Sequence, residues 1–109
     1  MSSTTEDRRT WAELSALQRD SLLAVLALDR HGDLPTLTAV EEELAESHDV
    51  SRTGIWRALQ VLHRADLVND ESHPDFERRP VYRPTEAGRR MVEAKIDTDA
   101  HRVGLEVVR

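Results

Sequence analysis

Twelve residues in the middle of the chain, SRTGIWRALQVL from Ser51 to Leu62, have the pattern of a short helix with two unlike faces. At about 100° per residue, the apolar side chains fall on one side and the polar ones on the other. Three arginines and no acid occur up to Arg64, although the whole chain has a formal net charge of −6. The apolar face consists of Ile55, Ala58, Leu59 and Leu62, and the opposite face of Thr53, Trp56, Arg57, Gln60 and Arg64.

A helix of this kind is either an ordinary amphipathic surface helix or one that lies in the major groove of DNA. The preceding sequence favours the second interpretation. Capping-box spacings at Ser15–Gln18 and Thr38–Glu41 predict two further helices, and Gly32 is placed to end the first. The connector His48–Val50 then leads to Ser51 as the cap of the helix over 51–64. Two short helices joined by about four residues form a helix-turn-helix.

The sequence after this helix predicts a β-hairpin. Leu67–Asp70 and Pro80–Arg83 are candidate strands, separated by a long polar tip. Thr85 can then cap a fourth helix. The order helix, helix, helix, hairpin, helix predicts a mainly α fold with a small β-hairpin, a winged helix-turn-helix with an additional C-terminal helix. We expect a disordered N-terminus over 1–10, a winged-helix domain over 11–96 that includes a dimerisation helix, and a C-terminal extension over 97–109 that adds to the dimer contact.

Each polar residue of this region has an expected role on DNA. Ser51 and Thr53 can donate to phosphates where the helix has free amides. Arg57 and Gln60 are placed to reach bases, because Arg pairs with guanine and Gln with adenine. Arg52 can do either, while Arg64 is expected on a phosphate. The expected DNA contacts are Ser51, Arg52, Thr53, Trp56, Arg57, Gln60, Arg64, Arg78, Arg79 and Arg83.

Three of these assignments have alternatives. Trp56 either packs under the wing, which we favour, or contacts sugars and thymine methyl groups. Arg78 and Arg79 either enter the minor groove from the wing, residues 70–80, or form a solvated pair balanced by nearby acids. Arg83 is nearer the base of the strand and is expected to contact a phosphate.

Composition excludes several other classes of protein. The chain has 109 residues and no cysteine, which excludes disulfides and thiolate metal sites. No two of the five histidines have i, i+4 spacing, so neither a metal nor a cofactor is expected. No nucleophile–base pair, glycine-rich phosphate loop or paired-carboxylate motif stands out, so the chain is not expected to be an enzyme. No apolar run approaches a membrane span and the first residues are polar and acidic, so we expect a cytoplasmic protein.

The charges are unusual. Asp and Glu number 21, and Lys95 is the single lysine among 15 basic residues. Proteins of extreme halophiles have such surfaces, although a GC-rich coding sequence also favours Arg over Lys. Of these two explanations for the composition, we favour a halophilic source. A net-acidic chain does not attract DNA by its overall field. We therefore expect a local basic patch and, as a hypothesis, cations that bridge acids such as Asp49 or Glu77 to phosphates.

The residues VSRTGIWRALQVLHRADLV, from Val50 to Val68, resemble the recognition helix of PadR-like transcription regulators. The run VYRPTEAGRR from Val81 to Arg90 is similar to their second wing strand and the helix after it, and MarR-like proteins share much of this run. Asp66 stands where that family has an exit glycine, which is costly if the turn needs a positive φ. The resemblance implies a homodimer on a pseudo-palindromic operator, with the terminal helices at the interface. We place this interface on Trp11, Met91, Val92, Ile96, Val103 and Leu105.

The leading prediction is a dimeric, sequence-specific transcription regulator that binds double-stranded DNA. It reads the major groove with helix 51–64 and the minor groove with the wing. The alternatives are a winged-helix module for protein–protein contact and a non-specific architectural DNA-binding protein.

Overall fold

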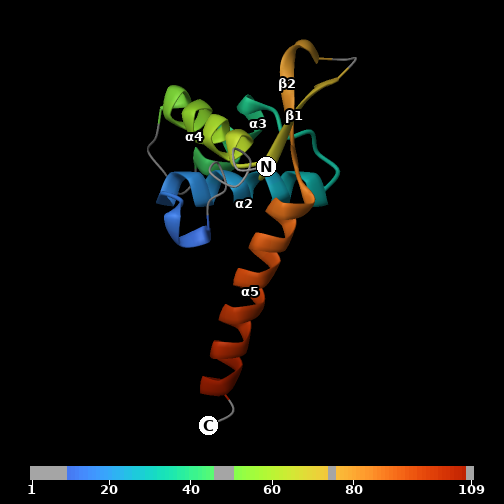
Figure 1. The fold of residues 1–109 in the computed structure, drawn as a ribbon. Helices are drawn as coiled ribbons and strands as arrows, with labels where there is room; N and C mark the ends of the chain where they lie inside the picture. Colours follow the sequence, from blue (N-terminus) through green and yellow to red (C-terminus); the bar gives the residue numbers. More distant parts are fainter. Residues whose placement is uncertain (1–9, 46–50, 74–75, 108–109) are drawn as a thin grey trace.

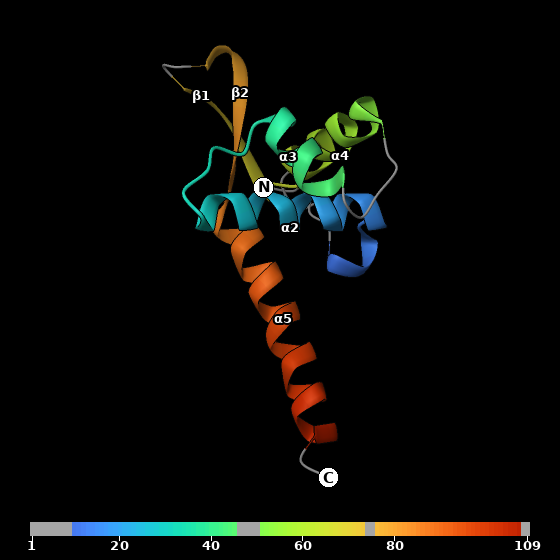
Figure 2. The same ribbon diagram turned by 180° about the vertical axis from the view of Figure 1, so that it is seen from behind.

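The computed structural model describes residues 10–45, 51–73 and 76–107. A short 3-10 helix, η1 (Trp11–Glu13), is followed by α2 (Ala16–Arg30), α3 (Leu37–Ala45) and α4 (Arg52–Arg64). The hairpin strands β1 (Val68–His73) and β2 (Phe76–Pro84) come next, and α5 (Glu86–Val107) is last. This order confirms the predicted mainly helical, winged helix-turn-helix fold. The hairpin and α5 project in opposite directions from the domain formed by α2, α3 and α4 (Figures 1 and 2).

The central helix α2 begins and ends at the predicted residues. The backbone amide of Gln18 donates to Ser15 Oγ at 3.2 Å, and the backbone amide of Ser15 donates to Gln18 Oε1 at 3.0 Å. These two bonds complete the capping box. Gly32, with φ of +77°, lies in the left-handed region just after the last turn. Leu22 and Val25 are fully buried at the centre of the core.

The helix-turn-helix differs from its prediction at the start of α3. The expected capping box Thr38–Glu41 is wrong: α3 begins at Leu37, and Thr36 Oγ1 accepts from the Ala39 amide at 3.1 Å. Thr36 can cap the helix because it forms a β-bridge with Val81 that places it at the helix start. The predicted connector His48–Val50 lies outside the described residues.

Helix α4 has the predicted bounds and cap. The Gly54 amide donates to Ser51 Oγ at 3.0 Å. Ile55, Leu59 and Leu62 are at most 1% exposed, so the apolar face is core, as expected. Because this face packs on α2 and α3, the opposite face is directed away from the domain.

The hairpin strands are longer than predicted. They pair in antiparallel register, with Asp70 opposite Tyr82 and a bulge between Glu71 and His73. Residues 71–79 contain one large apolar residue, Phe76, and show no apolar alternation, so the sequence contained no strand signal there. At the base of the hairpin, the Tyr82 amide donates to the Pro35 carbonyl at 2.9 Å, which fixes the hairpin to the segment before α3.

Helix α5 is joined tightly to the end of α4. Thr85 Oγ1 accepts from the Gly88 amide at 3.0 Å, as the predicted cap should, and donates to the Asp66 carbonyl at 2.6 Å. Asp66 has φ of 63°, so the turn does require the left-handed region. The helix continues unbroken past residue 96 to Val107, where the sequence predicted no conformation.

Candidate nucleic-acid interface

The outer face of α4 presents most of the residues expected to touch DNA. Thr53, Arg57 and Arg64 are exposed, and Gln60 is partly buried. In the described part of the chain, Arg57 and Arg64 have no ion-pair partner. Because a guanidinium without an internal partner loses no ion pair on binding, these two arginines are the best placed to meet an anionic ligand.

Trp56 does not have its favoured role. We expected it to pack under the wing, but it remains 47% exposed. It lines a cavity of about 190 Å³ between α3, α4 and β2. Tyr82 and Pro80 of β2 line the same cavity. The cavity is lined by Thr36, Leu37, Thr38, Arg52, Trp56, Pro80 and Tyr82.

Tyr82 belongs to this site although the sequence did not single it out. Its side chain, on β2, is fully buried, and Gln60 Nε2 of α4 lies 3.5 Å from its hydroxyl. Burial raises the pKa of Tyr82, and the negative charge of Asp70 acts in the same direction. The contact places the Gln60 amide toward the hairpin, so Gln60 is less free than Arg57 to approach a base.

The other arginines expected to bind DNA are engaged within the protein. Arg52 is paired with Glu41, and Arg83 Nη1 lies 2.9 Å from Asp29 Oδ1. Arg83 Nε is also 3.7 Å from Glu71 Oε2. The structure therefore gives Arg83 a role in fixing the hairpin to α2. The backbone of Arg78 and Arg79 lies in β2, but their side chains are outside the described residues.

Asp29 joins three parts of the fold and was missed by sequence reasoning. Its carboxylate binds Arg83 of β2 and also Arg89 of α5, with Arg89 Nη2 at 2.6 Å from Oδ2. An acid near the C-terminal end of a helix opposes the helix dipole, so this position is unfavourable without such partners. No local signal marks it, because both partners lie more than 50 residues away along the chain.

We expect Asp29→Asn to lower the free energy of unfolding by about 1–2 kcal/mol at neutral pH. The loss leaves two arginines facing each other, although their partial exposure limits it. Burial raises the pKa of Asp29, but the hydrogen bonds and charges of Arg89 and Arg83 outweigh burial and lower it. A lowered pKa stabilises the fold above the unfolded value of about 3.9, and this contribution is lost as the pH falls through the folded value.

Chemical denaturation between pH 7 and pH 3 measures this effect. The wild type should lose more stability than Asp29→Asn over that range. Asp33→Asn, which changes an exposed acid nearby, serves as the control. Equal stability of the two variants at pH 7 would contradict a joining role for Asp29.

The predicted dimer residues whose side chains are described differ in their exposure. Val92 is 2% exposed and belongs to the core, so its assignment to the dimer interface is wrong. The first turns of α5 pack on α2 and β2, which buries Val92. Trp11 and Met91 are partly buried against the same core, and the Arg19 guanidinium lies 5.6 Å from the Trp11 ring centroid. Ile96, in contrast, is 50% exposed on the projecting part of α5, while the side chains of Val103 and Leu105 lie outside the described residues.

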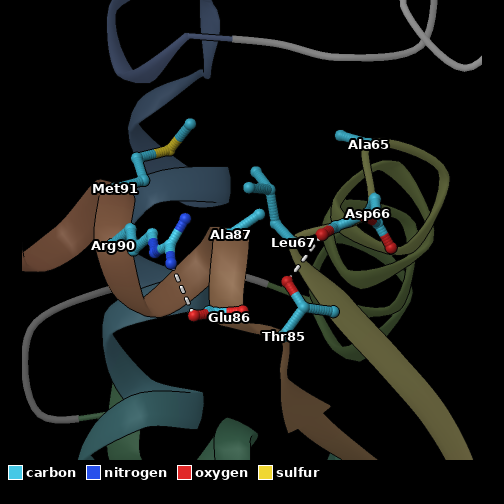
Figure 3. Close-up of a pocket in the computed structure, with 8 residues that line it drawn as sticks. All are labelled: Ala65, Asp66, Leu67, Thr85, Glu86, Ala87, Arg90 and Met91. Carbon is cyan, nitrogen blue, oxygen red and sulfur yellow. Dashed lines mark hydrogen bonds and ion pairs between the residues drawn. The ribbon is translucent and has the colours of Figure 1, made fainter.

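A second cavity, of about 470 Å³, lies where the turn after α4 meets α5 (Figure 3). Arg90 pairs with Glu86 at its edge, with 2.7 Å between Nη2 and Oε1. The described residues contain no group of three His, Asp or Glu side chains that could hold a metal ion. The cavity is lined by Ala65, Asp66, Leu67, Thr85, Glu86, Ala87, Arg90 and Met91.

Comparisons with known proteins identify the fold. No protein-family model matches the sequence, and no curated protein matches it. Similar solved structures include a mutant of ZitR from Lactococcus lactis (TM-score 0.59, 19% identity, 92% of this chain) and BpsR from Bordetella bronchiseptica (0.64, 19%, 90%). A third is the adhesin competence repressor AdcR from Streptococcus pyogenes (0.59, 18%, 95%).

The chain spans 61% of the length of ZitR and 68% of the lengths of BpsR and AdcR. The DNA binding of BpsR is regulated by 6-hydroxynicotinic acid. At these identities the likeness concerns the fold. Among the described residues, no helix is both long enough and apolar enough to span a membrane.

Proposed function

We propose that this chain is a DNA-binding transcription regulator that inserts α4 into the major groove. The observation that carries the proposal is the outer face of α4, where Trp56, Arg57 and Arg64 are exposed and the two arginines have no ion-pair partner among the described residues. The capped N-terminus of α4 adds backbone amides that favour a phosphate. DNA binding by BpsR and the repressor name of AdcR, two proteins of similar fold, support the same interpretation.

The proposed contacts follow from which side chains are available. Arg57 is assigned to a base edge and Arg64 to a phosphate, with Ser51 and Thr53 at the phosphate nearest the helix start. Gln60 is also assigned to a base edge, which it would contact from its position beside the Tyr82 hydroxyl. Arg78 and Arg79 remain assigned to the minor groove through the wing. Arg83 is left out, because its guanidinium is bound to Asp29.

We further propose a homodimer in which the projecting part of α5 meets its counterpart in a second copy. Ile96 is a large apolar side chain exposed on this arm, and Val103 and Leu105 follow on the same helix. A dimer with two copies of α4 would read a pseudo-palindromic operator, with the half-sites about one helical turn apart. PadR-like regulators remain the proposed family, with MarR-like regulators as the alternative.

The proposed setting is a cytoplasm of high salt, where the acidic, lysine-poor composition is suited to remain soluble. DNA binding there must withstand the loss of affinity that salt normally causes. Cations bridging acids to phosphates would flatten this dependence. The acids proposed for this role are Asp49 and Glu77, and neither side chain lies within the described residues.

Genome-wide mapping of bound sites, followed by fluorescence anisotropy, tests the proposed function. We expect the full chain to bind a mapped promoter fragment about 10³-fold or more tightly than a scrambled duplex of the same composition. Equal affinity for the two would instead indicate an architectural DNA-binding protein. Failure to bind either duplex at low salt would reject DNA binding and leave protein–protein contact as the alternative.

A further inference from the structure

We infer that Glu41 holds Arg52 in the free protein and that Arg52 moves to a DNA phosphate on binding, so that Glu41 sets the affinity for DNA. This inference rests on the proposed function and adds a competition between an internal carboxylate and the DNA backbone. It changes the role of Arg52 from a freely available contact to one that is released when DNA arrives.

The geometry places Arg52 between the two helices of the helix-turn-helix. Arg52 is the first residue of α4, and its Nη1 lies 2.8 Å from Glu41 Oε1 on α3. Its Nη2 donates to Thr38 Oγ1 at 3.1 Å, one turn earlier on the same helix. Both contacts therefore draw the guanidinium toward α3.

The same side chain lies beside the wing. Arg52 and Trp56 of α4 line the cavity of about 190 Å³ together with Pro80 of β2. The recognition helix and the wing are the two parts proposed to contact DNA, and a strand that touches both must pass near this cavity. Arg52 can therefore reach a phosphate of that strand by a change of side-chain rotamer.

The charges favour the exchange. A cation in the first turn of a helix opposes the helix dipole, so Arg52 does not stabilise α4 where it stands. Its side chain is 50% exposed and that of Glu41 is 36% exposed, and ion pairs this accessible to water are weak. A phosphate at the start of α4 would gain both the helix amides and a charge-assisted bond from Arg52. The phosphate is thus the stronger partner.

The test compares Glu41→Gln with Glu42→Gln, which removes the same charge from an exposed neighbour on α3. The probe is a 30-base-pair duplex of random sequence, because phosphate contacts do not depend on sequence. At low salt we expect Glu41→Gln to bind about three- to fivefold more tightly than wild type, and Glu42→Gln to stay within about 1.5-fold. The advantage should fade as salt screens the pair.

A second pair of variants separates transfer of Arg52 from a general effect of charge. Arg52→Gln should make the slope of log K against log salt shallower by about 0.9, the value for one lost phosphate contact. In that background, Glu41→Gln should have no more effect than Glu42→Gln. Equal effects of the two glutamate variants, or an unchanged slope in Arg52→Gln, would overturn the inference while leaving DNA binding intact. A wild-type chain that does not bind the duplex would overturn the proposed function and the inference with it.

Discussion

Gly88→Ala is expected to lower the free energy of unfolding by about 2–3 kcal/mol, the largest effect on stability that we expect from any single methyl group. A Cβ atom at Gly88 would collide with the carbonyl oxygen of Leu67, and it would lie 3.1 Å from the carbonyl carbon. This obstacle is backbone, and the same carbonyl accepts from the Thr85 amide at 3.1 Å. Helix α5 would have to move away from the turn after α4, and the melting temperature should fall by about 10 °C.

Gly54→Ala is the matched control, because it adds a methyl group to a glycine within α4. There the new Cβ would lie 3.3 Å from Ser51 Oγ and 3.6 Å from Leu17 Cδ2, both of which are side-chain atoms that can adjust. The better helix propensity of alanine offsets the tight contact, so the change should stay within about 0.5 kcal/mol. Differential scanning calorimetry of both variants decides the matter: similar losses at the two sites would refute the close approach at Gly88.

The close approach at Gly88 gives the run TEAGR at the start of α5 a structural role. Thr85 caps the helix and donates to the Asp66 carbonyl, and Gly88 lets the helix lie against Leu67. Arg89 pairs with Asp29 on α2. These residues fix α5 to the helix-turn-helix, and the residues proposed to bind DNA lie elsewhere.

The sequence predicted best those features whose cause is local. Ser15, Ser51 and Thr85 act as caps where their spacing predicted them, because a hydroxyl binds an amide only three residues away. The two faces of α4 were also correct, since a helical repeat shows directly in the order of residues. The order of these helices and strands along the chain then predicted the fold.

The errors arise where distant segments decide the outcome. Thr36 caps α3 because a β-bridge to Val81 holds it there, and this contact spans 45 residues. Val92 was expected at the dimer interface, yet the close approach of α5 to the domain buries its side chain in the core. Arg52 and Arg83 were expected to be available for DNA, but Glu41 and Asp29 reach them from other helices. Periodicity does not reveal any of these contacts.

The outer face of α4 leads to the second large effect, on DNA binding. Arg57→Ala should weaken binding to the mapped operator by about 5- to 150-fold, or 1–3 kcal/mol, if Arg57 reads a base. The side chain is exposed, and no ion pair holds it within the part of the chain that the structure describes, so its removal should leave the fold intact. Binding to a scrambled duplex should change much less, because a base contact contributes little there.

Arg64→Ala is the control, since Arg64 lies two turns further along the same face and is also exposed. A phosphate contact should weaken binding to operator and scrambled duplex alike, and its loss should make the salt slope shallower by about 0.9. Anisotropy titrations of both variants on both duplexes, over a series of salt concentrations, distinguish the two roles. Equal losses on operator and scrambled DNA for Arg57→Ala would show that Arg57 contacts phosphate. The reading of bases would then pass to Gln60, whose amide lies beside the buried Tyr82 hydroxyl.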